Sequence, residues 1–571
     1  MGSMNFRYVL IGLLCLVNGC SQLGIHTNAQ TTAHAPALPG PRSLYHAEGY
    51  YDYLLAQYYL RANQTDLAIE AYNKALKKDP LSPQLLTELS SLYVRQGKIE
   101  SALKLAEEAT KTDPDYETAY MLLGQIYAGL GRNEKAIKSY EHVIKMNPSN
   151  EDAHLLLGTL YAQEGRFAEA METFDRLRSL LPDNPVALHY KARVFLDMKF
   201  YDQAEAMYQE VLTLDPTFEQ ALLDLAYIYE VTDRTKAAEE SYRRILSFNP
   251  ASIQAHTRMG NLAMREGRLD EALQQFQQLV KLNPNDIESR LKIGILHLQK
   301  KDYDSAVSTL SQLLKEQPQY DQALYYLATA YEEKGDHDQA IADFRLVSRN
   351  SPLWVTAQVR LALVFAKTKD YQTSTEILQE AVSKQPDAPE PYLYLGIVHE
   401  EQKQYEEALR NLDKGIEKAP QDVDLLFRKG IILDKLDRKK EAVEMMQRIL
   451  VLEPKNANAL NYIGYTYAEM GINLREARQF VKSAMEVEPE DGYIMDSLAW
   501  VYYRMGQSKK ALQTILEAIK RVPQDPVIHE HLGDIYQSLG KKSKAVEAYQ
   551  KALEYQHSEP DKIREKLNLL K

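Results

Sequence analysis

The residue types that most often perform catalysis are present in this chain, but their spacing does not support a catalytic site. His529 and His531 stand two residues apart on an expected helix, so they lie about 200° apart around its axis. Histidines that share a zinc ion on one helix stand four residues apart, as in HExxH, so this pair cannot bind one ion. The acidic pair Glu332-Glu333 lies on an expected helix surface, where a solvated carboxylate is far commoner than an acid–base catalyst.

Other histidines and the loops add no catalytic feature. His297 and His399 occupy the repeat position that is Tyr127 or Tyr161 elsewhere, and we interpret them as ring substitutes at a packed edge. The sequence has neither a Gly-rich phosphate loop nor a nucleophile elbow. We therefore expect a protein that is not an enzyme and that uses no cofactor, no metal and no small-molecule substrate.

Both cysteines of the chain lie near its N-terminus. Residues 1–19 place Arg7 before the apolar run YVLIGLLCLV, which is typical of an export signal. The run is about ten residues long, whereas a membrane-spanning helix needs ~20, so we expect residues 1–19 to be cleaved. Cys15 would leave with them. With Cys20 as the last cysteine, we expect neither a disulfide nor a thiol nucleophile in the folded body.

The residues around Cys20 are similar to a lipidation motif. The sequence LVNGC resembles the lipobox of bacterial lipoproteins, which implies that Cys20 is diacylated and becomes the mature N-terminus. By that family's sorting rule, Ser21 in place of aspartate implies the outer membrane. The alternative is an ordinary secretory signal with an incidental cysteine. Residues 20–43 have one charged side chain, Arg42, and no helical periodicity, so we expect a flexible tether of ~25–30 Å.

The rest of the chain repeats one 34-residue pattern, which residues 117–150 show clearly. Apolar residues recur at helical spacing up to Tyr127, a short break follows, and the spacing resumes at Ala136. Pro148 ends the second segment because proline has no N–H to donate. The pattern predicts two helices that approach closely where Gly124 and Ala136 are small.

Proline marks one position of the repeat along the chain. Eleven successive steps of 34 residues separate the first twelve prolines, and one step of 35 and another of 34 follow. The position of Gly124 is Gly, Ala or Ser in all fifteen repeats, and that of Ala136 is alanine in fourteen. Scattered prolines would not keep this register, so the chain is a repeat array. These prolines are Pro80, Pro114, Pro148, Pro182, Pro216, Pro250, Pro284, Pro318, Pro352, Pro386, Pro420, Pro454, Pro489 and Pro523.

These repeats resemble the tetratricopeptide repeat family. The resemblance extends over residues 44–557, and it implies an all-α, right-handed α-solenoid of about 15 antiparallel helix pairs with a groove lined mainly by the first helix of each pair. One pair buries too little apolar surface alone, so each depends on its neighbours. In residues 558–571, Ile563, Leu567 and Leu570 form one apolar stripe, and we expect a helix that caps the last repeat.

The second, fifth, ninth and twelfth residues of each repeat are expected to face the groove. In repeats eight to twelve the fifth and ninth positions are mostly apolar, interrupted by Tyr325 and Thr329, which suits an amphipathic helix or an apolar peptide segment. The alternative is tighter packing between adjacent first helices. The apolar positions are Leu291, Ile295, Val359, Leu363, Leu393, Ile397, Phe427 and Ile431.

Repeats thirteen and fourteen have mainly amide and aromatic residues at the four positions expected to face the groove. Together these groups suit an extended peptide, because amides bond its backbone and rings supply contact area. The alternative makes Trp500 a residue that fills the core. The positions are Asn458, Asn461, Tyr465, Tyr493, Asp496, Trp500 and Tyr503.

The thirteenth repeat has one extra residue in its turn, within MGINLREA. The block from Leu460 to Gly540 is similar to the C-terminal repeats of exported bacterial tetratricopeptide lipoproteins. Among these it most resembles an outer-membrane adaptor that binds a carboxyl-terminal processing protease and brings peptidoglycan-cleaving hydrolases to it. The resemblance implies a scaffold in the outer membrane that faces the periplasm, with a protease, cell-wall hydrolases or envelope-assembly proteins as partners.

A second interpretation is a pilotin-like or polysaccharide-export assembly component, since such proteins also combine a lipobox with tetratricopeptide repeats. The formal net charge is -12, and no basic stripe offsets it, so we expect no nucleic-acid partner. We expect contact with the membrane through the lipid anchor only.

Overall fold

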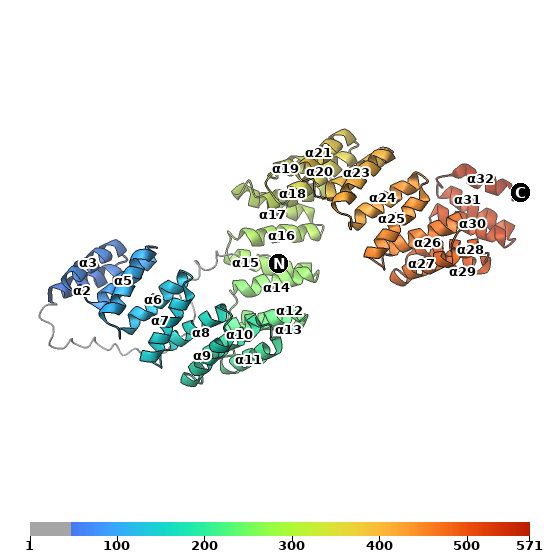
Figure 1. The fold of residues 1–571 in the computed structure, drawn as a ribbon. Helices are drawn as coiled ribbons and strands as arrows, with labels where there is room; N and C mark the ends of the chain where they lie inside the picture. The colour runs from blue at the N-terminus through green and yellow to red at the C-terminus, as the bar shows by residue number, and fades with distance from the viewer. Residues whose placement is uncertain (1–46, 571) are drawn as a thin grey trace. The chain divides into compact units, whose positions relative to one another are not determined.

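The described part of the chain is entirely helical. The computed structural model describes residues 47–570, which form 31 helices and contain no strand. Figure 1 shows these helices with the labels used below. They divide into two units, the first ending at Leu262 and the second beginning at Ala263. The predicted all-α architecture of paired helices is confirmed within each unit. The predicted signal segment (residues 1–19), Cys20 and the tether (20–43) lie outside the described residues.

In the first unit, first and second helices of successive repeats alternate along the chain. The first helices are α2 (Ala47–Arg61), α4 (Pro83–Arg95), α6 (Glu117–Gly129), α8 (Glu151–Gln163), α10 (Pro185–Asp197), α12 (Glu219–Val231) and α14 (Ile253–Arg265), within which the second unit begins. The second helices are α3 (Thr65–Lys78), α5 (Ile99–Thr112), α7 (Asn133–Met146), α9 (Phe167–Leu180), α11 (Tyr201–Leu214) and α13 (Thr235–Phe248).

The second unit continues the same alternation and ends with one additional helix, α32 (Pro560–Asn568). Its first helices are α16 (Ile287–Gln299), α18 (Asp321–Lys334), α20 (Trp354–Lys367), α22 (Glu390–Glu401), α24 (Val423–Lys435), α26 (Ala457–Met470), α28 (Gly492–Arg504) and α30 (Pro526–Ser538). Its second helices are α15 (Leu269–Leu282), α17 (Tyr303–Glu316), α19 (His337–Leu346), α21 (Tyr371–Lys384), α23 (Tyr405–Lys418), α25 (Lys439–Leu452), α27 (Leu474–Val487), α29 (Ser508–Arg521) and α31 (Lys542–Glu554).

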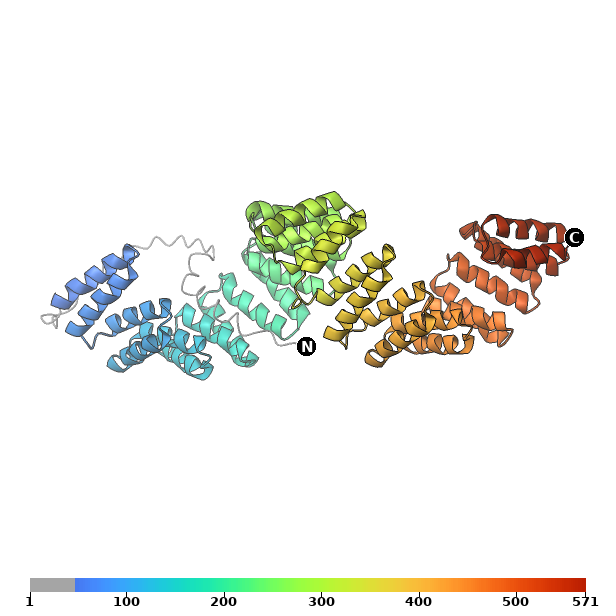
Figure 2. The ribbon, with the colours of Figure 1, turned by 90° about the horizontal axis from the view of Figure 1, so that it is seen from above.

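Helices contact their neighbours in the chain order. Within each unit, with α14 at the boundary left aside, each first helix packs most extensively on the second helix of its own repeat, and each second helix packs on the following first helix. Successive first helices, such as α26 and α28, also touch. Figure 2 shows these antiparallel pairs from a second direction. The buried core of each unit is therefore a row of local clusters, as expected when repeats depend on their neighbours.

The two helices of a pair approach closely where the first helix has a small residue. A Cβ atom added at Gly124 would lie 2.5 Å from Cε1 of Tyr140, whose ring is 2% exposed. Gly158 faces Phe174 in the next repeat in the same way. An aromatic ring thus lies directly on a bare stretch of backbone, and this contact sets the distance between the two helices.

A left-handed residue ends each first helix and turns the chain into the second. In the third repeat this residue is Gly131, with φ 67°, and in the eleventh it is Lys403, with φ 58°. The turn of the thirteenth repeat contains two such residues, Gly471 and Asn473. The second one accommodates the extra residue that the sequence places there.

Tyrosines near the end of the first helices connect neighbouring repeats. The hydroxyl of Tyr127 donates to Glu107 of the preceding second helix at 2.7 Å, and Tyr161 donates to Glu141 at the same distance. Burial, with the Glu107 carboxylate beside it, raises the pKa of Tyr127 to about 12. These hydroxyls therefore stay protonated and remain donors at neutral pH.

One second helix departs from the repeat. α19 has 10 residues, whereas α17 and α21 have 14, and the chain from Val347 to Leu353 is not helical. Trp354 then begins α20 with its side chain buried beside Val355 and Ala381. Pro352 keeps the regular register, so the spacing of prolines gives no sign of this change.

Replacing Gly124 with valine should destabilise the first unit. The added side chain meets the buried ring of Tyr140, and overpacking of this kind costs about 1–3 kcal/mol. Urea denaturation followed by circular dichroism should show the loss. In the double variant Gly124→Val, Tyr140→Ala, the loss of unfolding free energy should differ from the sum of the two single losses by about 0.5–3 kcal/mol. The reason is that Tyr140→Ala removes the ring with which the valine side chain collides. Strict additivity would contradict the contact.

Candidate functional site

All predicted partner-binding residues lie on first helices of the second unit. The apolar group is distributed over α16, α20, α22 and α24, and the amide and aromatic group lies on α26 and α28. The fifth and ninth positions are separated by one turn of helix, so each helix presents its two positions on one side. The two groups differ in how much of each side chain a partner can reach.

Side chains of the apolar group are mostly engaged in packing. Leu291 and Val359 are 4% and 1% exposed, so a partner cannot reach them in this structure. Leu291 packs with Leu310 of α17 and Leu327 of α18. The rest of the group is half-buried, and three of its members pack against the core formed by α23, α24 and α25. These contacts favour the alternative in which this stripe joins adjacent helices. The half-buried members are Ile295, Leu363, Leu393, Ile397, Phe427 and Ile431.

Rings gather on α26, α28 and α30 at the C-terminal end of the second unit. The Trp500 ring stacks between Tyr503, at 4.9 Å between centroids, and His531, at 4.1 Å. Tyr465 approaches the same histidine at 6.2 Å. Tyr493 is 54% exposed, which makes it the most accessible ring of the predicted set. The structure therefore brings Tyr465 and Trp500 to His531, with Tyr503 stacked on Trp500.

A buried ion pair lies beneath the Trp500 ring. Nδ1 of His531 is 2.9 Å from both carboxylate oxygens of Asp496, and the two residues are 4% and 7% exposed. Burial alone would lower the pKa of His531, but the Asp496 carboxylate outweighs it, so the pKa is raised. Asp496 therefore faces His531 and not a partner. Its effect on the surface is to fix the imidazole on which Trp500 stacks.

Two buried polar atoms of the predicted set have no hydrogen-bond partner within the described residues. They are Nε1 of Trp500, a donor, and Oδ1 of Asn461, an acceptor. A buried unpaired group costs about 1–3 kcal/mol. Asn458, one turn earlier on α26, is exposed. A small movement that uncovers these atoms would present the complementary donor and acceptor of an extended peptide backbone.

The last helix occupies the corresponding positions of the fifteenth repeat. Nζ of Lys566 on α32 lies 2.7 Å from Glu530 and 2.6 Å from Asp534, which are the fifth and ninth residues of that repeat. Burial would raise the pKa of Glu530, but Lys566 and Lys562 outweigh it and lower the pKa. Ile563 of the same helix is fully buried against Tyr549. The accessible aromatic surface therefore ends with the fourteenth repeat.

Two of these contacts were not predicted from the sequence. His531 is the sixth residue of its repeat, outside the four positions expected to face a partner, and Lys566 belongs to the terminal helix. Two successive repeats have an acidic residue at the fifth position, Asp496 and Glu530. This pattern indicates that a cationic side chain of the same protein lies beside each of them. The sequence alone does not say which residue supplies it.

Histidines elsewhere on these helices have structural partners. His297 lies 3.2 Å from Asp302 and His399 lies 2.8 Å from Gln404, both within their own turns. His529 contacts the carbonyl of Pro523 at 2.9 Å, away from His531. No group of three or more His, Cys, Asp or Glu side chains among residues 47–570 is arranged to hold a metal ion.

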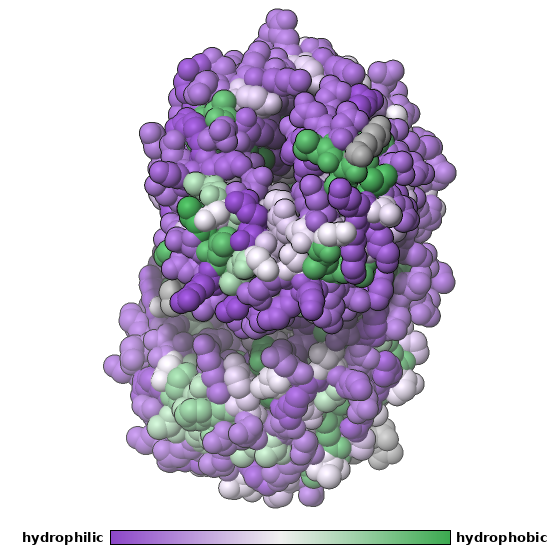
Figure 3. All heavy atoms as spheres, turned by 90° about the vertical axis from the view of Figure 1, so that its right-hand side faces the viewer, coloured by the Kyte–Doolittle hydropathy of each residue, from purple (hydrophilic) through white to green (hydrophobic). Residues whose placement is uncertain are grey.

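The exposed surface in Figure 3 is predominantly hydrophilic, with hydrophobic residues in separate patches. No helix of the described chain combines the length and the apolar character needed to cross a membrane.

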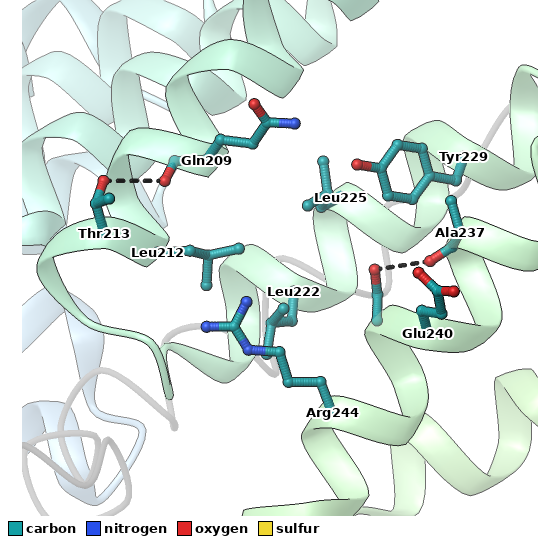
Figure 4. Close-up of a pocket in the computed structure, with 10 residues that line it drawn as sticks. Gln209, Leu212, Thr213, Leu222, Leu225, Tyr229, Ala237, Glu240 and Arg244 are labelled. Carbon is teal, nitrogen blue, oxygen red and sulfur yellow. Dashed lines mark hydrogen bonds between the residues drawn. The ribbon is translucent and has the colours of Figure 1, made fainter.

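A cavity of about 450 Å³ in the first unit lies between α11, α12 and α13 (Figure 4). Leu212, Leu222 and Leu225 form its apolar part, and Gln209, Glu240 and Arg244 lie around it. Arg244 donates to the carbonyl of Pro216 at 2.6 Å, so its guanidinium already serves the adjoining turn. This is an open crevice formed by the second helices α11 and α13 together with the first helix α12.

Family models of the tetratricopeptide repeat match residues 53–185, 327–389 and 365–426, and a tetratricopeptide repeat-like domain matches residues 473–571. Together they cover more than half of the chain, on the same helix pairs described above. The chain belongs to the tetratricopeptide repeat family. Residues 222–343 also match the middle TPR-like domain of cilia and flagella-associated protein 70. Proteins of this family are generally non-catalytic and mediate protein–protein interactions, so a scaffold is indicated.

Among curated proteins, the TPR repeat-containing protein PA4667 of Pseudomonas aeruginosa is 41% identical over 59 residues. That match spans only 10% of this chain and 10% of the relative.

Solved structures with similar helices include a tetratricopeptide repeat protein from Parabacteroides merdae, with 18% identity, a TM-score of 0.36, and coverage of 44% of this chain and 98% of that one. The APC/C hetero-tetramer Cut9-Hcn1 has 14% identity and a TM-score of 0.34, with coverage of 80% and 98%. Naa15/Naa10 bound to HypK-THB has 14% and 0.33, with 92% and 96%. These scores are too low to bear on what the chain binds.

Replacing Asp496 with asparagine should lower the pKa of His531, because burial then acts with less opposition. Because the pKa of His531 is higher in the folded state than the unfolded value of ~6.5, protonation of His531 stabilises the native state. This contribution is complete below the unfolded pKa and is lost as the pH rises through the folded pKa. Urea midpoints of the wild type should therefore fall above about pH 6.5 more steeply than those of the variant.

The titration itself can be followed by NMR of ring-labelled histidine, with the resonance assigned by His531→Gln. An unchanged pKa of His531 in Asp496→Asn would show that the carboxylate does not control it.

Proposed function

We propose that this protein is a non-catalytic scaffold, lipid-anchored through Cys20 in the outer membrane and facing the periplasm, that binds protein partners on the first helices of repeats thirteen and fourteen. Membership of the tetratricopeptide repeat family supports the scaffold. The resemblance of LVNGC to a lipobox supports the anchor, and Ser21 supports the outer membrane.

The observation that most supports this surface is the stack of Tyr503, Trp500 and His531, with the exposed ring of Tyr493 on the same helix as Trp500. Aromatic side chains dominate the binding energy of protein interfaces because they offer a large contact area with few rotatable bonds. Stacking also holds Trp500 in one orientation before a partner arrives, which reduces the entropy lost on binding.

An extended peptide segment is the occupant that best suits these groups. The peptide planes and side chains of such a segment can pack on the rings. Its backbone carbonyls can accept from Nε1 of Trp500, and its backbone amides can donate to Oδ1 of Asn461. The similarity of residues 460–540 to exported adaptor lipoproteins supports partners from the cell envelope. A processing protease to which the scaffold presents cell-wall hydrolases is the arrangement we propose.

Replacing Tyr493 with serine should weaken partner binding without unfolding the repeat, because this ring is 54% exposed. An aromatic contact at the centre of an interface contributes about 2 kcal/mol or more, so recovery in affinity purification from an envelope extract should fall about 30-fold. The matched control is Val451→Ser on α25, a second helix, where the side chain is 82% exposed.

Quantitative mass spectrometry of the two purifications decides the result. The proposed surface requires that proteases or cell-wall hydrolases be depleted with Tyr493→Ser and retained with Val451→Ser. The variant pair Phe427→Asp, Trp500→Ala extends the test to both predicted groups. Identical partner profiles for all variants would remove the first helices as the binding surface.

Replacing Cys20 with serine should abolish acylation and leave the leader uncut. Labelling of growing cells with an alkyne-bearing fatty acid should mark the wild type and not the variant. Fractionation should place the labelled wild type in the outer membrane. An unlabelled wild-type protein would refute the anchor, and a labelled one in the inner membrane would refute the sorting inferred from Ser21.

A further inference from the structure

The first described helix, α2, has an exposed aromatic side. Tyr51, Leu54 and Tyr58 are 68%, 49% and 65% exposed, and Tyr50 beside them is 58% exposed. Their spacing of three and four residues places them on one side of the helix, and Arg61 continues that side. Figure 1 shows α2 at the start of the first unit. We call these five residues the tyrosine face.

Two positions of this face, those of Tyr51 and Tyr58, are buried in every later repeat. Tyr51 corresponds to Ala119 in the third repeat and Tyr58 to Ile126, which are 0% and 2% exposed. Ala119 packs with Ala109 of the preceding second helix. Within the described residues no second helix precedes α2. The side of a first helix that packs on the preceding repeat elsewhere therefore faces solvent in α2.

The residue types on the tyrosine face do not suit another repeat. Later repeats have a small or aliphatic residue at this position, such as Ala119 or Leu85, and none has an aromatic ring, whereas α2 has Tyr51. Tyrosine combines an apolar ring with a hydroxyl that must stay hydrated or bonded. This combination is typical of side chains at the boundary between lipid and water, where the ring lies among the headgroups and the hydroxyl meets water.

Charge on the tyrosine face also suits phospholipid. Asp52 is the only charged residue from Tyr50 to Leu60, and it is buried with an ion pair to Lys78 at 2.9 Å. Arg61 is exposed at the end of the face. From Tyr50 to Leu60 the helix has no exposed carboxylate, and with the cation of Arg61 this stretch is favoured near anionic headgroups, even though the whole chain has a net charge of -12.

The extent of the face favours a membrane over a second copy of the chain. Partly exposed rings of this size offer about 100–150 Å² each, so the face supplies about 500 Å². A stable protein interface buries about 800 Å² on each partner. A chain anchored by a short tether needs only weak affinity, because tethering raises the effective concentration of the face at the bilayer to the mM range.

We infer that the tyrosine face lies against phospholipid headgroups and orients the first repeat at the membrane surface; this rests on the proposed anchor at Cys20. This contact with the membrane would be additional to the acylated Cys20, whereas the sequence predicted contact through the lipid anchor only. The first pair of helices is then held at the bilayer, and the chain beyond it projects from a fixed starting point.

A spin label tests the inference on the whole acylated chain. Cys15 would be removed with the leader and Cys20 would be acylated, so Leu54→Cys provides one free thiol. The labelled protein is reconstituted in vesicles of phosphatidylethanolamine and phosphatidylglycerol. Collision of the label with oxygen should rise, and collision with a water-soluble nickel complex should fall about threefold or more, relative to a label at Leu81→Cys. Leu81 is 69% exposed after α3 but lies outside the tyrosine face.

The outcomes separate this inference from the proposed function. Adding Tyr51→Ser and Tyr58→Ser should return the Leu54 label to the water-exposed values of Leu81→Cys. Equal accessibility of the two labels in an acylated chain would overturn the inference and leave the anchor intact. Dipolar broadening between Leu54 labels would overturn it in favour of self-association. Mass spectrometry that shows no acyl chain on Cys20 would refute the anchor, and with it this inference.

Discussion

The fold depends on the close approach of the two helices of a pair, which several pairs achieve by placing a glycine of the first helix against an aromatic or aliphatic side chain of the second. Tyr140 lies on Gly124 and Phe174 on Gly158, with no room for a Cβ atom between them. Leu310 lies on Gly294 in the same way. Because the distance between the two helices is fixed here, the outer sides of the pair are fixed as well, and the next pair can pack on them.

The sequence predicted the paired helices well because their determinants are local and repeated. A left-handed residue such as Gly131 and a proline such as Pro148 act within a few residues of their own position. The extra residue near Gly471 was visible for the same reason. The shortened α19 was not, since Pro352 keeps the regular spacing while Trp354 enters the core. Burial of that ring is decided by neighbouring helices, which spacing does not describe.

The candidate site was predicted in part. Helical periodicity gives the side of a helix on which a residue lies, but not how deeply it is covered, so Leu291 and Val359 were expected at the surface and are buried. Periodicity grouped Tyr465, Trp500 and Tyr503 correctly, and their proximity was accessible to sequence reasoning. Their link to His531 was not, because that contact crosses between repeats and depends on the position of Asp496.

Contacts that run only between neighbours have a genetic consequence. Since the helices within each unit touch the adjacent ones and little else, a recombination event that copies or deletes one 34-residue segment restores the same junction on both sides. The length of such a protein can therefore change by whole repeats while the helices at the two ends of its described part, α2 and α32, stay the same. Selection can therefore change the number of repeats without changing how the side chains of the core pack.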